Sequence, residues 1–194
     1  MERIDLHTHT LASDGAAAPA DVVRKAAALG LRAVAVTDHD TFAGLPAARA
    51  AGQRCGIEVV PGGELSTGWG GEEVHLLGYF MDTEDTALRA LMTRATDERN
   101  ARNETMVQRL HDAGYPITMD DLHAAFPGQT VLGRPHIAAL LVQRGCVASV
   151  PDGMRGLLGR GKEFYVPRYN VPLEDFIRAL RAAGGVPVVA HIFK

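Results

Sequence analysis

The chain has 194 residues, of which 46% are hydrophobic and 22% are charged. This length and composition predict one main globular domain with room for a small insertion. The formal net charge of −3 excludes a generally basic surface that would hold nucleic acid by neutralising phosphates. The two cysteines, Cys55 and Cys146, exclude a disulfide framework and a cysteine-based zinc site, and they fit a reducing compartment.

The start of the chain carries no basic leader followed by an apolar run, so we expect no secretory signal. No apolar stretch approaches the roughly 20 residues that a membrane helix needs. The expected location is therefore cytoplasmic, without contact to a membrane.

Strand and helix signals alternate over the first ninety or so residues. The expected elements are strands over residues 4–9, 31–36, 57–61 and 73–80, with helices over 19–29 and 47–52. Pro19 suits the first turn of a helix, and Gly30 suits a helix end. The alternation predicts a parallel sheet with helices packed outside it.

The middle of the chain changes to helical patterning. Apolar residues share one face around 88–92 and again around 106–110, and shorter helices are expected over 119–126 and 135–144. The alternation returns with a helix over 172–183 and a strand over 186–190. We predict an α/β domain made of residues 1–83 and 165–194, interrupted by a helical insertion of residues 84–164.

The first candidate site residues are His7 and His9. Side chains alternate along a strand, so both imidazoles point to one face, about 7 Å apart at their α-carbons, where they can bind one divalent metal. Ile4 and Leu6 are expected to supply the opposite, apolar face. The pair ends a strand, which is where α/β folds place their ligands. The alternative is two surface histidines.

A second polar run, Thr37 to Asp40, directly follows an apolar strand. Such a run is unfavourable unless it faces a polar cleft or an ion, and we expect His39 to be a ligand there. Asp38 and Asp40 are alternatively residues of a capped turn.

Four further residues complete the predicted site. Glu64 follows the third strand and is able to bridge two metals, as a carboxylate can; His75 lies within a strand, His191 closes one, and Asp14 lies in a turn. Taken singly, these would be a loop acid, a core histidine, a strand-end histidine and a turn residue. Their repeated placement at strand ends predicts a shared centre, and the nitrogen and oxygen donors suit Zn²⁺, Mn²⁺ or Fe²⁺.

Together these motifs resemble the PHP (polymerase and histidinol phosphatase) family. The similar segments are His7-x-His9, Asp14-Gly15, Thr37-Asp38-His39-Asp40, Pro61-Gly62-x-Glu64, His75 and Val188-Val189-Ala190-His191. The resemblance is greatest to the bacterial branch that hydrolyses nucleoside 3′,5′-bisphosphates, some members of which trim 5′-phosphorylated RNA. It implies a distorted (β/α)7 barrel that holds up to three metals.

The resemblance also implies how the ligands are shared. One metal would take His7, His9 and Glu64. A second would take Glu64, His75 and His191, and a third would take Asp14 and His39. The catalytic residues implied are Glu64, His9 and His39.

The segment Gly133 to His136 resembles the same branch. With Pro135 at the first helical position, Arg134 would be the cap and His136 would lie in the first turn. An arginine at a helix N-terminus can hold phosphate, so Arg134 and His136 are candidate substrate contacts; the alternative is a capping arginine with a core histidine. Arg160, Lys162 and Arg168 we expect to be solvated charges, with phosphate contact as the weaker interpretation.

The sequence departs from the pattern of the family near its end. In the family the barrel continues beyond the His191 motif with a final Asp-x-His, whereas here Ile192-Phe193-Lys194 follows. We therefore expect a C-terminally incomplete barrel in which only the metal set of Glu64, His75 and His191 is full. Such a chain would bind metal weakly or need a partner at its open edge.

The predicted function is metal-dependent hydrolysis of a nucleotide phosphomonoester, with the 3′-phosphate of a nucleoside 3′,5′-bisphosphate as the expected target. The expected partners are a small phosphorylated nucleotide or the 5′ end of a short RNA, and not a DNA duplex. The alternatives are a histidinol-phosphate-type phosphatase and a metal- or nucleotide-binding module with impaired catalysis.

Overall fold

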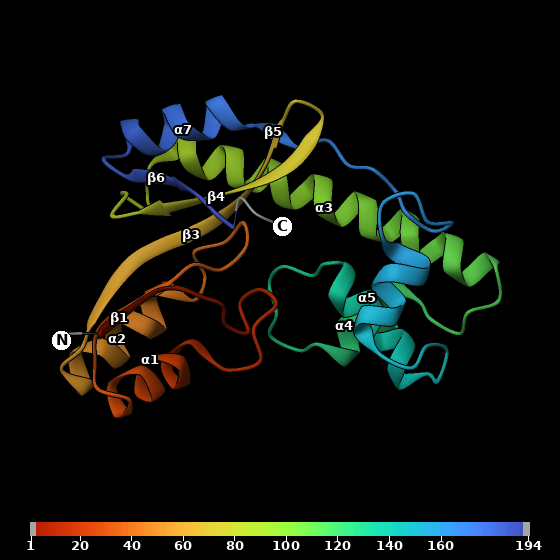
Figure 1. Cartoon of the computed structure of the whole chain (residues 1–194), viewed down its shortest axis with the longest axis horizontal. Helices are drawn as coiled ribbons and strands as arrows, with labels where there is room; N and C mark the ends of the chain where they lie inside the picture. Colours follow the sequence, from red (N-terminus) through yellow and green to blue (C-terminus); the bar gives the residue numbers. More distant parts are fainter. Residues whose placement is uncertain (1–2, 192–194) are drawn as a thin grey trace.

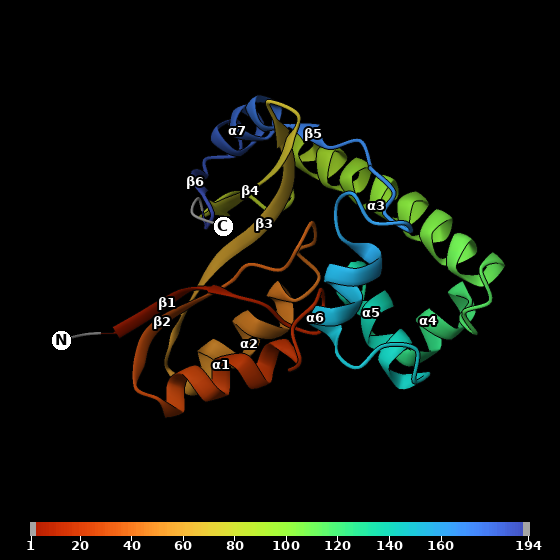
Figure 2. The same ribbon diagram turned by 45° about the vertical axis from the view of Figure 1, so that its right-hand side comes forward.

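In the computed structural model, which describes residues 3–191, six strands form one curved sheet that resembles part of a barrel (Figure 1). Helices α1 and α2 cover one end of this sheet, α7 and the long α3 cover the other, and α4 to α6 form a separate helical lobe (Figures 1 and 2). The strands are β1 (Arg3–Thr8), β2 (Leu31–Val36), β3 (Glu58–Trp69), β4 (Glu72–Tyr79), β5 (Val171–Pro172) and β6 (Val186–Val189). The helices are α1 (Pro19–Ala28), α2 (Leu45–Cys55), α3 (Thr86–Asp112), α4 (Met119–Ala125), α5 (Arg134–Gln143), α6 (Val150–Gly153), a π-helical turn (Met154–Leu158) and α7 (Leu173–Ala182).

The predicted α/β class is confirmed, but the sheet is mixed. The strand order is β1-β2-β3-β4-β6, with β5 beside β3. Strands β1, β2 and β3 are parallel, whereas β4 runs antiparallel to both β3 and β6. The expectation of a parallel sheet is therefore wrong for β4, which returns from β3 through the tight turn at Gly70 and Gly71. Both glycines have positive φ, which a two-residue hairpin turn favours.

Strand β3 is much longer than the segment 57–61 predicted for it. Its first part pairs with β2, and residues 62–69 pair with β4. By composition, Gly62 and Gly63 indicate the end of a strand. In the structure they instead allow neighbouring residues to pack closely against β3. A Cβ on Gly62 would lie 2.8 Å from Thr37, and one on Gly63 would lie 2.8 Å from Phe42. Glu64 thus lies inside a strand and not after its end.

Three of the four apolar clusters within residues 3–191 hold the helices in place. One packs α1 and α2 on β2 through residues such as Val23, Val34 and Ala48. A second packs α7 and the first half of α3 on β3 and β4, centred on Phe176. Full burial of a side chain of this size contributes about 1.5–3 kcal/mol. The third cluster forms the helical lobe and includes Met106 in the second half of α3.

Helix α3 belongs to two of these clusters, so it joins the sheet to the helical lobe (Figure 1). The division into a barrel domain of 1–83 and 165–194 and an insertion of 84–164 remains a prediction. Among the helices of residues 3–191, none combines the length and apolar character needed to cross a bilayer.

The two outer strands of the sheet, β1 and β6, expose apolar side chains. Ile4 is 55% exposed and Leu6 36%, so the apolar face that they supply on β1 is not buried. Val186, Val188 and Val189 on β6 are also exposed. The physical reason is that β1 is an outer strand of the described sheet and pairs on one side only. The predicted chain-end segment Ile192-Phe193-Lys194 lies outside the described residues.

Candidate metal centre

The carboxylate of Glu64 lies at the centre of the site, with 1% of its side chain exposed. Five imidazoles surround it, and their nearest nitrogens lie 2.6–3.7 Å from its two oxygens. Oε2 faces His7 at 2.9 Å, His9 at 3.0 Å and His39 at 3.7 Å. Oε1 faces His75 at 2.6 Å and His191 at 2.9 Å.

Backbone pairing aligns Glu64 with His39. The Glu64 amide donates to the carbonyl of Asp38 at 3.1 Å, and the Asp40 amide donates to the carbonyl of Glu64 at 3.0 Å. This pair of bonds continues the β2–β3 ladder past the end of β2, as a parallel bridge between residues 39 and 64. The side chains of His39 and Glu64 are therefore fixed next to each other by main-chain hydrogen bonds.

The loop after β1 carries His9 and Asp14, and it is held by a buried carboxylate. Asp38, with 1% exposure, accepts hydrogen bonds from the Thr10 amide, the Thr10 hydroxyl and the Ser13 hydroxyl, each at 2.7 Å. His9 Nδ1 lies 3.3 Å from Asp14 Oδ1, while His9 Nε2 points to Glu64. Asp38 therefore positions the loop, and it is not among the groups of potential metal ligands in residues 3–191.

Asp40 plays a similar supporting part on the other side of Glu64. Its buried carboxylate accepts from the Ser66 amide at 2.7 Å and from Arg99 Nη2 at 2.5 Å. Arg99 also donates to Ser66 Oγ at 2.7 Å, so helix α3 is tied to β3 next to Glu64. Burial alone would raise the pKa of Asp40, but Arg99 and Arg168 outweigh it and hold that pKa below its usual range. No local pattern indicates Arg99, because its partner Asp40 is 59 residues away in the chain.

The histidines around Glu64 do not share one protonation behaviour. Burial opposes the charged form of His75, yet hydrogen bonds to Glu64 and Glu73 outweigh it and raise the pKa to about 9. Burial dominates at His39 and lowers its pKa to about 4. Burial likewise opposes ionisation of Glu64, but its hydrogen bonds to the imidazoles hold its pKa well below the usual range.

The donor set fits divalent metal ions. Three groups have ligand atoms within 4.8 Å of one another: His7, His9 and Glu64; His9, Asp14 and His39; and His39, Glu64 and His75. The distances from His39 Nε2 to Asp14 (3.6 Å) and to Glu64 (3.7 Å) are too long for hydrogen bonds. They suit ligands that share an ion, since metal–ligand bonds are about 2.0–2.2 Å. Nitrogen and carboxylate donors without thiolate match Zn²⁺, Mn²⁺ or Fe²⁺.

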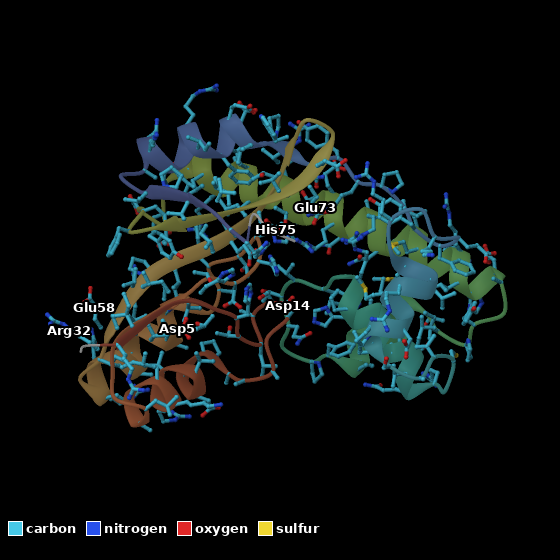
Figure 3. The ribbon with its side chains drawn as sticks, viewed as in Figure 1. Asp5, Asp14, Arg32, Glu58, Glu73 and His75 are labelled. Atoms are coloured by element: carbon cyan, nitrogen blue, oxygen red, sulfur yellow. The ribbon has the colours of Figure 1, made fainter. Side chains whose placement is uncertain are left out.

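All seven residues predicted as metal ligands line one hollow of about 270 Å³: His7, His9, Asp14, His39, Glu64, His75 and His191. Figure 3 shows Asp14 and His75 facing the space between the sheet and the helical lobe. His75 lies within a strand, as expected, and this strand is the antiparallel β4. It reaches the centre because β4 crosses beside Glu64, opposite residue 66 of β3.

The predicted substrate contacts lie beside this hollow, and the N-cap of α5 is one residue earlier than expected. Gly133 is the N-cap of α5 and Arg134 is its first residue, so Arg134 is not the cap. His136 is 5% exposed, and its Nδ1 accepts the Gly133 amide at 2.9 Å, which takes up the capping role. Arg134 and His136 line a small hollow together with Asp14, His39 and His75.

A larger cavity of about 760 Å³ adjoins the metal centre. Its wall includes His75 and His191 from the centre, and Arg134 and Arg168 from the helical side. Arg168 is only 3% exposed, so the expectation that it is a solvated charge is wrong. Arg160 is 64% exposed and pairs with Glu72.

Comparison with known proteins agrees with this geometry. The PHP domain family model matches residues 5–142. The 5′-3′ exoribonuclease Rnm of Salmonella typhimurium is 36% identical over 189 residues, which are 96% of this chain and 64% of that protein. The 3′,5′-nucleoside bisphosphate phosphatase of Chromobacterium violaceum is 36% identical over 191 residues, which are 98% of this chain and 67% of that protein. This chain thus spans about two thirds of the length of these relatives.

Two solved structures share the fold. A metal-dependent phosphoesterase from Bifidobacterium adolescentis superposes with a TM-score of 0.92 at 33% identity, covering 98% of this chain and 67% of the other. An amidohydrolase from Chromobacterium violaceum, solved with sulfate and without metal, gives a TM-score of 0.91 at 36% identity, covering 97% and 66%. The family match, these similarities and the histidine–carboxylate centre lead to one conclusion: the chain belongs to the PHP domain family.

Proposed function

We propose that this chain is a metal-dependent phosphoesterase that removes the 3′-phosphate from nucleoside 3′,5′-bisphosphates and also acts on short 5′-phosphorylated RNA. The observation that carries the proposal is the buried Glu64 carboxylate with five imidazoles around it. Without a cation the buried carboxylate is balanced by protons on imidazoles such as His75, whose pKa is raised to about 9, and divalent ions would take the place of those protons. Similarity to a bisphosphate phosphatase and to exoribonucleases supports the choice of substrate.

The chain's residues divide into ligands and supports. Glu64, with His7, His9, Asp14, His39, His75 and His191, would hold up to three ions, and His9 and Glu64 each face two of the groups. When bound, such ions lower the pKa of water and withdraw charge from phosphoryl oxygens. Arg134, 22% exposed and next to the hollow, would hold the non-reacting phosphoryl oxygens.

The catalytic assignments rest on position. Glu64 is the most buried residue of the hollow and His9 faces both Glu64 and Asp14, so these two would orient the attacking group; His39 stands opposite Asp14. The low pKa of His39 keeps its imidazole neutral, and able to bind an ion, at neutral pH. His136 caps α5 through one ring nitrogen and also bonds the backbone at Ser13, so a substrate contact would replace the second of these bonds.

The test is phosphate release from adenosine 3′,5′-bisphosphate by the full chain with added Mn²⁺. We expect turnover, and we expect His9→Ala to reduce kcat/KM by at least about 100-fold, as the loss of a catalytic-site group does. The matched control is His123→Ala, an exposed histidine on α4, which should leave kcat/KM unchanged. No turnover by the full chain, or unchanged turnover in His9→Ala, contradicts the proposal. Stoichiometric metal and tight nucleotide binding without turnover would instead identify a binding module.

A further inference from the structure

His75 presents a different ring nitrogen to the metal centre from the other histidines around Glu64. Its Nδ1 lies 2.6 Å from Glu64 Oε1, whereas the other four imidazoles turn Nε2 toward the same carboxylate. The Nε2 of His75 therefore points away from Glu64. Because a neutral imidazole binds an ion through the nitrogen that carries no proton, the group that holds a proton on Nε2 decides whether Nδ1 is free to bind.

The carboxylate of Glu73 contacts this second nitrogen. Glu73 Oε1 lies 3.2 Å from His75 Nε2. The two residues are two positions apart on β4, so their side chains leave the same face of the strand, and Figure 3 shows Glu73 beside His75. An ionised carboxylate can only accept a hydrogen bond. The contact therefore favours the form of the ring that carries its proton on Nε2.

The other ligands of the hollow are supported differently. Among residues 3–191, His75 is the only histidine of the hollow whose second nitrogen contacts a carboxylate from outside the seven ligands. His9 Nδ1 faces Asp14, which is itself a predicted ligand, and His39 Nδ1 is buried without a hydrogen-bond partner within the same residues. The support from Glu73 is thus specific to His75 and to the ion that His75 would help to bind.

Glu73 is in turn held from the side opposite His75. Its Oε1 lies 3.7 Å from Arg168 Nη2, and its Oε2 lies 3.9 Å from Arg134 Nη2. Both arginines, together with Arg102, line the cavity of about 760 Å³, which is the arginine cavity of this molecule. These two distances are too long for hydrogen bonds, so the arginines attract Glu73 by charge. Its side-chain hydrogen bond among the described residues goes to His75.

We propose that Glu73 is a positioning residue of the metal centre, which holds the proton of His75 on Nε2 so that the ring binds an ion through Nδ1. This rests on the proposed function only in taking the centre to bind divalent ions. A carboxylate behind a metal-bound imidazole fixes the tautomer and the orientation of the ring and raises its basicity as a ligand. Loss of such a partner weakens metal binding by about 10- to 100-fold.

The first experiment identifies the ring nitrogen of His75 that binds the ion. The full chain, with isotope-labelled histidines, is stripped with a chelator and loaded with Zn²⁺. Proton–nitrogen correlation spectra then distinguish the two ring nitrogens, and His75→Gln assigns the signals. We expect Nδ1 to be bound to Zn²⁺ and Nε2 to carry a proton that exchanges slowly with water. Binding through Nε2, or no binding of Zn²⁺ by the unmodified chain, overturns the proposal.

Variants of Glu73 then test its role. Glu73→Gln keeps the size of the side chain but removes the charge, so the affinity for the ion at His75 should fall about 10- to 100-fold in calorimetric titrations with Mn²⁺. In the Zn²⁺-loaded variant, the Nε2 proton should exchange faster. Glu73→Asp keeps a carboxylate and should lose less affinity. The matched control is Glu72→Gln, because Glu72 is the neighbour of Glu73 on β4, is 62% exposed and pairs with Arg160; both measurements should match the unmodified chain.

A merely structural role of Glu73 predicts a different result. If Glu73 only linked β4 to the arginines, Glu73→Gln would lower the free energy of unfolding in urea. It would leave Mn²⁺ affinity and the exchange of the His75 Nε2 proton unchanged, and that outcome contradicts the proposal. If Glu73→Gln fails to fold, Glu73→Asp and the spectrum of the unmodified chain decide the matter.

Activity separates this proposal from the proposed function. With adenosine 3′,5′-bisphosphate, Glu73→Gln should raise the Mn²⁺ concentration for half-maximal phosphate release about 10- to 100-fold, while kcat at saturating Mn²⁺ stays within about threefold. A fall in kcat that Mn²⁺ does not restore contradicts the positioning role. If the unmodified chain releases no phosphate, the proposed function fails, and the spectra and titrations still decide the role of Glu73.

Discussion

The metal centre and the arginine cavity are adjacent but opposite in character. At the centre, imidazole nitrogens and carboxylates offer electron pairs that suit cations. In the cavity, guanidinium groups offer hydrogen-bond donors and leave positive charge uncompensated. Glu73 touches both, because it lies 3.2 Å from His75 and 3.7 Å from Arg168. The two regions therefore call for ligands of opposite charge. The metal centre suits cations and the cavity suits an anion, and a metal-bound phosphorylated nucleotide supplies both.

The two regions also differ in how they are built. Strands β1, β2, β3, β4 and β6, or the residues directly after them, each bring a ligand to the metal centre. The arginines come from helix α3, from the start of α5 and from the segment before β5. The first region depends on sheet register and the second on how α3 lies across the sheet (Figure 2).

The largest expected effect comes from removing the shared carboxylate. Glu64→Gln keeps the size of the side chain but removes the charge around which five imidazoles gather, so it should weaken Mn²⁺ binding at least 1,000-fold, on the order of 4 kcal/mol. Equilibrium dialysis with elemental analysis measures this. The matched control, Glu72→Gln, changes an exposed glutamate on the same hairpin and should bind metal as the unmodified chain does. Full metal binding by Glu64→Gln would contradict the claim that the Glu64 carboxylate is the shared ligand of the metal centre.

A smaller effect is expected from removing the Asp40 carboxylate, which links α3 to β3 through Arg99. Asp40→Asn leaves the buried guanidinium of Arg99 without its closest carboxylate, which should lower the free energy of unfolding by about 3 kcal/mol. Urea unfolding monitored by circular dichroism checks this value. Asp175→Asn, which removes an exposed pair with Arg178, should change stability by less than about 1 kcal/mol. Similar values for both variants would contradict the claim that Asp40 is a buried support of the site.

The smallest expected effect is a difference between the two regions in how ligand binding depends on pH. Because the pKa of His75 is raised to about 9, this imidazole holds a proton at neutral pH and must lose it to bind a metal. Metal affinity should therefore rise with pH between 6 and 8, by up to about 10-fold per pH unit for each proton released. Binding of adenosine 5′-monophosphate to the metal-free chain should change little between pH 7 and 8, since the guanidinium groups stay charged and phosphate is already mostly dianionic. Calorimetry at three pH values tests both, and metal affinity that falls with rising pH contradicts the assignment.

Much of the metal centre could be predicted from the sequence because strand patterns and ligand types are local. His7 and His9 follow from side-chain alternation, and His39 from a polar run after an apolar strand. Strand β2 and helix α1 were also predicted almost to the residue, since Pro19 and Gly30 mark the helix limits.

What could not be predicted depends on long-range packing. Gly62 and Gly63 indicate a loop by composition, but they permit close contact within a continuous strand. Arg99, Arg102 and Arg168 look like surface charges in a charged sequence, and only the position of α3 against β3 buries them. The exposure of Ile4 and Leu6 likewise follows from the sheet order, which no local pattern contains.

The most direct test of the central claim is the metal dependence of phosphate release. The full chain is stripped with a chelator, and release from adenosine 3′,5′-bisphosphate is measured as Mn²⁺ is returned. We predict that stripping abolishes release and that Mn²⁺ restores it along a saturable curve that matches the measured binding of the ion. Release that persists after stripping, or a failure of bound Mn²⁺, Zn²⁺ and Fe²⁺ alike to restore it, would contradict the account.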